Sequence, residues 1–303
     1  MATQLKTDTN RSPFISIIFL IFFSQTYLDA AFENVGISAR PMGMGGSYTA
    51  LATGANAITW NPSGLVGLNR PELGLNYFEI HDLVNYSFIS LAIPIQPNHG
   101  IGFGLLSSSD LEELYQELIL NIAIAQKIWE TFQIGLNCEF LSSSASIDEI
   151  RVGSGRGIAL DIGVLYTMQE DQVAIGFNLP NLISHVNYNR QKLKNAEATS
   201  YHETLNHELG IGIAFKLGLL SKKMSRGTLA IDYANGAPLI GLEYLIQNVN
   251  VQFGYRFTHG ISRGPTMGFG YQFNNFRIDY AYVNGKYGSS TSVFSVTIND
   301  LRF

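Results

Sequence analysis

Apolar residues alternate with polar or small residues through most of the chain after residue 71. The stretch 249–257 shows this best, because apolar side chains alternate there with Asn250, Gln252, Gly254 and Arg256. Successive side chains of a β-strand point to opposite faces, so the pattern predicts a strand with one apolar and one polar face. We count about fourteen such segments by this criterion. They are residues 72–78, 84–94, 99–107, 117–126, 131–142, 157–169, 172–178, 205–217, 227–235, 238–246, 249–258, 266–274, 276–284 and 292–302.

Segment length and composition favour a membrane barrel over a soluble sandwich. Most segments have close to the roughly nine to eleven residues that a tilted strand needs to cross a bilayer. Only 14% of the residues are charged, whereas about a quarter are charged in soluble domains. A mean hydropathy of +0.10 is nevertheless too low for a bundle of membrane helices. We therefore expect an all-β fold: a transmembrane antiparallel β-barrel of about 14 strands with a short N-terminal helical, glycine-rich plug.

The connections between the predicted strands alternate in length. Tight turns are expected at 97–98, 170–171, 247–248 and 274–275, and longer loops at 108–116, 143–156, 179–204, 259–265 and 285–291. Outer-membrane barrels have short periplasmic turns and long external loops. The alternation therefore predicts that both chain termini are periplasmic, although the longer connection at 218–226 and the short one at 235–237 are exceptions.

The N-terminus has the features of an export signal. Lys6 and Arg11 precede an apolar run over residues 14–23, and small residues follow at Ala30 and Ala31. About ten apolar residues are too few for a spanning helix, so we favour a cleaved signal peptide over a membrane anchor. The predicted organisation is a signal peptide at 1–31, a plug segment at 32–70 and an outer-membrane barrel at 71–303, in a Gram-negative-type bacterium.

The stretch from residue 36 to residue 65 separates this signal from the first strand. Its glycines would let the backbone turn tightly or press against a wall, and Ser47 predicts the N-cap of a short helix over 47–52. We interpret the stretch as a compact plug in the barrel lumen; an ordinary N-terminal loop is the alternative. The candidate plug or gating residues are Pro41, Gly43, Gly45, Gly46, Asn61, Pro62 and Gly64.

Two blocks in this stretch, residues 39–46 and 55–65, resemble the start of PorV/PorQ-type outer-membrane proteins. Those proteins belong to the wider FadL-like barrel group, so the resemblance implies a fourteen-stranded barrel whose N-terminal segment fills the lumen. It further implies transport of small hydrophobic molecules or a part in protein secretion, with a hydrophobic ligand or secretion-system components as partners. A purely structural or adhesive barrel is the alternative. The terminal Phe303 resembles the signal read by the barrel-assembly machinery.

Charged residues of both signs fall on the predicted polar face. This suits a lumen in which wall charges pair with one another or with the plug, while the aromatic face meets outer-membrane lipids. The candidate lumen-facing residues are Glu139, Asp161, Asp232, Glu243, Arg256, Arg277 and Asp279.

Several chemistries are disfavoured by the sequence. The formal net charge of −5 argues against nucleic-acid binding. His202 and His207 are five residues apart beside a predicted strand, whereas a zinc-protease helix needs a spacing of four. No serine lies in a recognisable nucleophile turn. We therefore expect no catalytic residue, no metal site, no cofactor and no enzymatic activity.

Overall fold

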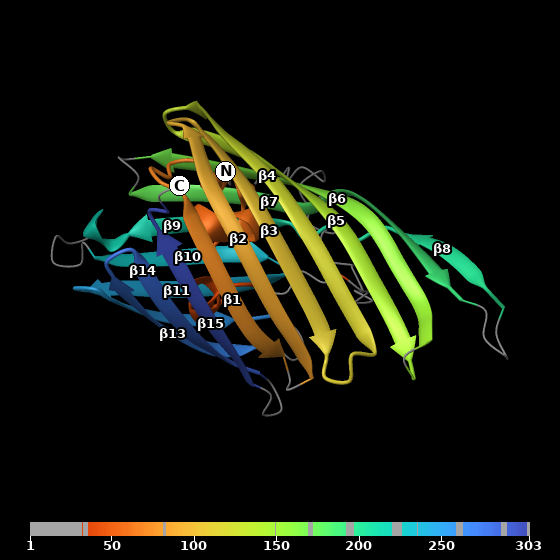
Figure 1. Ribbon diagram of the computed structural model, residues 1–303. Helices are drawn as coiled ribbons and strands as arrows, with labels where there is room; N and C mark the ends of the chain where they lie inside the picture. Colours follow the sequence, from red (N-terminus) through yellow and green to blue (C-terminus); the bar gives the residue numbers. More distant parts are fainter. Residues whose placement is uncertain are drawn as a thin grey trace, which may run out of the picture. The chain divides into compact units, whose positions relative to one another are not determined.

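Antiparallel strands close into a barrel in this computed structural model (Figure 1). The sheet has 15 strands in the described part of the chain. Consecutive strands pair from β1 to β8 and from β9 to β15, β7 also pairs with β9, and the pairing of β1 with β15 completes the ring. Only β8 stands outside the ring, because it pairs with the end of β7 alone. Fourteen strands therefore form the barrel, which confirms the fold predicted from the sequence.

The structure describes residues 32, 36–80, 83–148, 150–168, 172–191, 197–219, 226–234, 236–258, 263–285 and 290–301. Of these, residues 36 onward belong to one compact unit. The predicted signal peptide at 1–31 and the assembly signal at Phe303 lie outside the described residues and stay predictions. No helix in this described part is long and apolar enough to cross a membrane.

The strand bounds are β1 Glu72–Ile80, β2 Val84–Gln96, β3 His99–Asp110, β4 Tyr115–Trp129, β5 Phe132–Ile147, β6 Ile150–Met168, β7 Val173–Arg190, β8 Thr199–Glu203, β9 Gly210–Lys216, β10 Gly227–Ala234, β11 Ala237–Ile246, β12 Val249–Arg256, β13 Gly264–Phe273, β14 Phe276–Asn284 and β15 Ser290–Asn299. A short 3-10 turn, η3 Leu217–Leu219, follows β9.

The two faces of the wall are those expected from the alternation. On β12, Phe253 is 51% exposed and Gln252 only 1%, so aromatic side chains point outward and polar ones inward. β2 shows no clear alternation in the sequence because it is apolar on both faces. Its Ile89 points outward, while Phe88 is fully buried inside the barrel.

The predicted loops at 143–156 and 179–204 are wrong over most of their length. β5, β6 and β7 continue through these regions, so β6 has 19 residues and β7 has 18, against 7 in β9 and 8 in β10. These extensions are rich in Ser, Gly and Asn. They form strands because neighbouring strands supply hydrogen-bond partners, although no apolar alternation marks them.

One interruption breaks the wall beside β7. β9 pairs with β7 only as far as Asn178, and the pairing of β8 with β7 begins only at Val186. Between them, residues 179–185 face the irregular segment 204–209, and we call this part of the wall the seam. Two side-chain contacts bridge it: the Asn181 amide nitrogen donates to the carbonyl of Asn206 at 3.1 Å, and the Ser184 hydroxyl accepts from the N–H of Leu205 at 2.8 Å.

Residues 36–66, which precede β1, lie inside the ring of strands, and we define them as the plug (Figure 1). Its elements are two short helices, α2 Ala39–Gly43 and α3 Ala57–Trp60, and two 3-10 turns, η1 Gly54–Asn56 and η2 Pro62–Leu65. The helix predicted over 47–52 is wrong. The hydroxyl of Ser47 does not cap a helix, because it donates to Asp232 of the wall instead.

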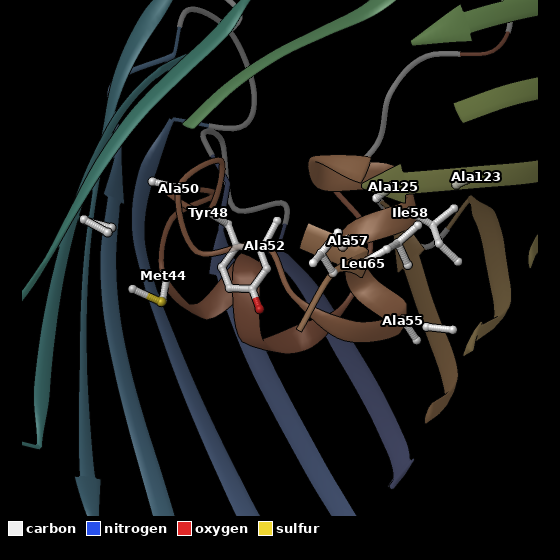
Figure 2. Close-up of a cluster of buried hydrophobic side chains, with 14 residues drawn as sticks. Met44, Tyr48, Ala50, Ala52, Ala55, Ala57, Ile58, Leu65, Ala123 and Ala125 are labelled. Carbon is white, nitrogen blue, oxygen red and sulfur yellow. The ribbon is translucent and has the colours of Figure 1, made fainter. Parts of the chain in front are cut away.

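The core of the molecule lies between the plug and the wall. Figure 2 shows Ile58 and Leu65 of the plug beside Ala123 and Ala125 of β4. All four are at most 5% exposed. Small side chains on the wall let the plug approach closely, so apolar burial and tight contact hold it there.

Candidate functional site

The candidate site is the attachment of the plug to the barrel wall. Arg40 of α2 forms a two-pronged ion pair with Glu243 of β11, with Nε at 2.9 Å from Oε1 and Nη2 at 2.7 Å from Oε2. The side chains are 21% and 8% exposed, respectively. Gln252 of β12 donates to the same Oε1 at 3.1 Å. A planar guanidinium matches both oxygens of a carboxylate, so this pair fixes the plug in one orientation.

A second arginine supports the same carboxylate from the wall. Arg277 of β14 donates to both oxygens of Asp279, and its Nη2 lies 3.8 Å from Oε1 of Glu243. Three of the seven predicted lumen residues therefore meet at one place. Arg40, which the sequence analysis missed, connects them to the plug. An arginine in a stretch otherwise free of charge was the signal that could have identified it.

Tyr48 completes the apolar side of this cluster. Its hydroxyl accepts from Nη1 of Arg40 at 3.1 Å, and the guanidinium carbon lies 5.4 Å from the ring centroid. The ring also makes an edge contact with Trp60 at 5.8 Å. Burial raises the pKa of the Tyr48 phenol above its ordinary value, so the hydroxyl stays neutral beside the ion pair.

Asp232 of β10 binds the plug at a second point. Its carboxylate accepts from the Ser47 hydroxyl at 2.9 Å and from the backbone N–H groups of Tyr48 and Thr49 at 3.0 and 2.8 Å. Asp232 is 2% exposed. Hydrogen bonds to an ionised acceptor are about twice as strong as neutral ones, so these three contacts compensate for burial of the carboxylate.

The predicted turn residues of the plug lie at its other end. The Asn61 amide nitrogen donates to the carbonyls of Thr49 at 2.9 Å and of Val164 on β6 at 3.1 Å. Asn61 also caps η2, accepting from the backbone N–H of Ser63 at 3.3 Å, and it accepts from the Ser63 hydroxyl at 2.6 Å. Pro62 occupies the first turn of η2. Gly64 packs directly against the backbone of Ala52.

The predicted glycines near α2 lie close to the wall. Gly45 has a φ of +69°, and a Cβ there would lie 2.9 Å from the backbone nitrogen of Tyr255. A Cβ on Gly43 would lie 2.8 Å from the Cα of Gly268. Gly46 also has a positive φ, and Pro41 is a buried residue of α2. Both glycine contacts exclude larger residues.

The remaining lumen-facing residues lie apart from this attachment. Asn137 of β5 donates to Asp161 at 2.9 Å and to Glu139 at 3.3 Å, which forms a second polar cluster. Arg256 of β12 has no hydrogen bond or ion pair among the described residues. No group of three or more His, Cys, Asp or Glu side chains able to hold a metal occurs in that part of the chain.

Comparison with protein-family models identifies the family of this barrel. The model of the type IX secretion system membrane protein family PorP/SprF matches residues 75–297, which is most of the barrel. The chain belongs to the PorP/SprF family. No curated protein sequence matches it significantly.

Solved structures show the same fold as this PorP/SprF-family barrel. The toluene transporter TodX of Pseudomonas putida has a TM-score of 0.66 at 12% identity, covering 89% of this chain and 100% of that one. The CymD monoaromatic hydrocarbon channel has a TM-score of 0.59 at 16% identity, covering 90% and 99%. A Pseudomonas aeruginosa FadL homologue has a TM-score of 0.58 at 12% identity, covering 88% and 98%. At these identities the similarity shows the FadL-like fold alone.

Proposed function

We propose that this PorP/SprF-family barrel acts in protein secretion by the type IX system, as a plugged, non-conducting barrel of the outer membrane with both termini in the periplasm. The observation that carries the proposal is the family match across residues 75–297. The proposed role is non-enzymatic, and its proposed contacts are outer-membrane lipids, the barrel-assembly machinery and secretion-system components.

The attachment of the plug supports a closed barrel. Removing one partner of a buried ion pair typically costs about 3–5 kcal/mol, because the other charge is left uncompensated. Displacing the plug would leave Glu243 without Arg40 and Asp232 without its three donors. A channel that opens readily would need a plug that can be displaced at a lower cost in free energy.

The narrower PorV/PorQ assignment is a proposal of its own. It depends on the blocks at 39–46 and 55–65, and the PorP/SprF match begins after both of them, at residue 75. The PorP/SprF match therefore does not cover the blocks on which the PorV/PorQ assignment depends.

The test is export in the native bacterium. We expect deletion of the gene to reduce the amount of type IX cargo at the cell surface and in the medium, and the wild-type gene to restore it. Total cargo in whole-cell lysates is the control for expression. Undiminished export in the deletion strain would contradict the secretion role.

Transport of small hydrophobic molecules is the second candidate, and the seam favours it. Backbone pairing with β7 is missing on one side over residues 179–185, where side-chain contacts replace it. Such a site could open toward lipid at lower cost than a continuous ladder, since fewer backbone bonds would break. Uptake of a radiolabelled aromatic hydrocarbon by cells that carry or lack the chain tests this candidate. Equal uptake would exclude it.

A further inference from the structure

Three arginines belong to the plug or to the lumen face of the wall, and one of them differs from the other two. Arg40 of the plug binds Glu243, and Arg277 of β14 binds Asp279. Arg256 of β12 makes no ion pair or hydrogen bond within the described part of the chain, and its Nε atom is buried without an acceptor. Ionisable residues inside a membrane protein are usually paired, so an unpaired one indicates a functional site.

The ladder partners of Arg256 offer no carboxylate. Its partners in the ladder are Leu239 on β11 and Gly264 on β13, neither of which has an acceptor side chain. The connection after β12, residues 257–263, and the connection after β14, residues 285–289, contain no Asp or Glu in the sequence. Neither ladder partner therefore supplies an acceptor side chain for this guanidinium, and neither connection supplies a carboxylate.

A second unpartnered group lies on the same face. Thr258 is two residues from Arg256, so both side chains point into the barrel. Thr258 is 9% exposed, and its hydroxyl has no hydrogen-bond partner among the described residues. A buried hydroxyl and a buried guanidinium Nε without acceptors are each unfavourable, and together they supply donors of the kind that an oxyanion requires.

We infer that Arg256 and Thr258 form a binding site for a small oxyanion, a carboxylate or a phosphate, inside the barrel. The guanidinium would donate to two oxygens of the ligand and the threonine hydroxyl to one of them. This site goes beyond the proposed role in secretion, because it does not involve the plug attachment at Glu243 and Asp232.

The plug determines from which end the site is reached. Gly45 of the plug lies against Gly254 and Tyr255, so Arg256 and Thr258 come after this contact as β12 runs toward the connection at 257–263. The opposite end of β12 begins at the tight turn at 247–248. The ligand therefore enters from the end of the barrel that carries the 257–263 connection.

The test is calorimetric titration of the full-length refolded protein in a nonionic detergent, with chloride as the sole buffer anion. Inorganic phosphate and hexanoate are the probes, and hexanol is the uncharged control. We expect an oxyanion to bind and Arg256→Gln to weaken binding by about tenfold or more, since a charge-assisted contact is lost. Thr258→Val should weaken it by roughly fivefold, as expected for one lost hydrogen bond. Arg190→Gln, at the exposed end of β7, should leave binding unchanged.

The two probes identify the source of the ligand. Binding of phosphate alone indicates a phosphate group, binding of hexanoate alone indicates a carboxylate with an apolar chain, and binding of both indicates recognition of the oxyanion only. No binding of either probe, or equal binding by Arg256→Gln and wild type, would overturn the proposal. Arg256 would then be an arginine that is hydrated by water inside the barrel.

Thermal unfolding provides a readout that does not depend on calorimetry. Without a bound oxyanion, the uncompensated charge destabilises the barrel, so Arg256→Gln should melt at a higher temperature than wild type. The oxyanion that binds should raise the melting temperature of wild type and leave that of the variant unchanged. Arg256→Lys keeps the charge and should retain part of the shift, which tests the site even if Arg256→Gln folds poorly. An equal shift in wild type and Arg256→Gln would contradict the proposal.

Discussion

At the scale of single residues, burial separates the charges that attach the plug from those that do not. Arg40 and Glu243 are largely buried, whereas Arg70, which pairs with Asp300, has a side chain that is 60% exposed. We predict that Arg40→Gln lowers the free energy of unfolding by about 3–5 kcal/mol, because Glu243 loses its principal partner. Arg70→Gln should cost about 0–1 kcal/mol, as exposed pairs do. Denaturant unfolding in detergent micelles measures both, and equal losses would mean that the plug does not depend on this ion pair.

Asp232 allows a second test at the same scale. Asp232→Asn replaces the carboxylate by a neutral amide of similar shape and puts an NH₂ donor among groups that are themselves donors. We predict a loss of about 1–3 kcal/mol and faster proteolysis of the plug. Asp110→Asn is the matched control, because Asp110 accepts one bond, from the N–H of Tyr115, at an exposed site. Its effect should be within about 0.5 kcal/mol. Proteolysis of the plug at the wild-type rate in Asp232→Asn would contradict the prediction.

Period-two alternation was enough to predict which residues face the lumen, but not which of them meet. Asp232 and Glu243 were placed on the inner face by parity alone. Their partners Ser47 and Arg40 belong to the plug, and the contact depends on how that segment sits in the ring, which no local pattern specifies. The same limit explains the helix wrongly predicted over 47–52. The Ser47 hydroxyl can either cap a helix or bind the wall, and here it binds Asp232, which is distant in the sequence.

At the scale of elements, the alternation predicts strands well only where one face of the strand contacts lipid and must therefore be apolar. β12, β13 and β14 match their predicted positions because one face must be apolar. β6 and β7 continue beyond their alternating parts, where apolar residues do not follow a period of two. The seam at residues 179–185 could not be predicted either, since it depends on the pairing of β7 with both β8 and β9.

Contact between wall and plug gives a prediction at this scale. A Cβ on Gly254 of β12 would overlap the backbone nitrogen of Gly45, whereas a Cβ on Gly153 of β6 would find its nearest atom at 3.7 Å. Gly254→Ala should therefore displace the plug locally and cost about 1–3 kcal/mol. Gly153→Ala adds the same methyl group to a strand without overlap and should be nearly neutral. Heat-induced mobility shifts on gels compare the two, and equal stability would show that the plug can move away from the wall at little cost.

At the scale of the whole molecule, the wall is built around the plug. The inner face carries many glycines and alanines where the plug lies, and these residues would border open space without it. Side chains just fill the interior of a barrel of about eight strands, while larger barrels leave a channel unless something occupies the lumen. The closed state that we propose for this fourteen-stranded barrel would therefore depend on residues 36–66.

Deletion of residues 36–66 tests that dependence directly. We predict that the wild-type protein shows almost no conductance in planar bilayers, that the deletion variant gives stable open channels, and that Arg40→Gln gives brief openings because its plug is less firmly held. Gly153→Ala should behave as wild type and controls for the refolding procedure. If the deletion variant inserts and yet remains closed, the lumen has collapsed or is filled by its own side chains. The plug would then be a structural core that the barrel folds around, and the charges at Glu243 and Asp232 would serve folding instead of closure.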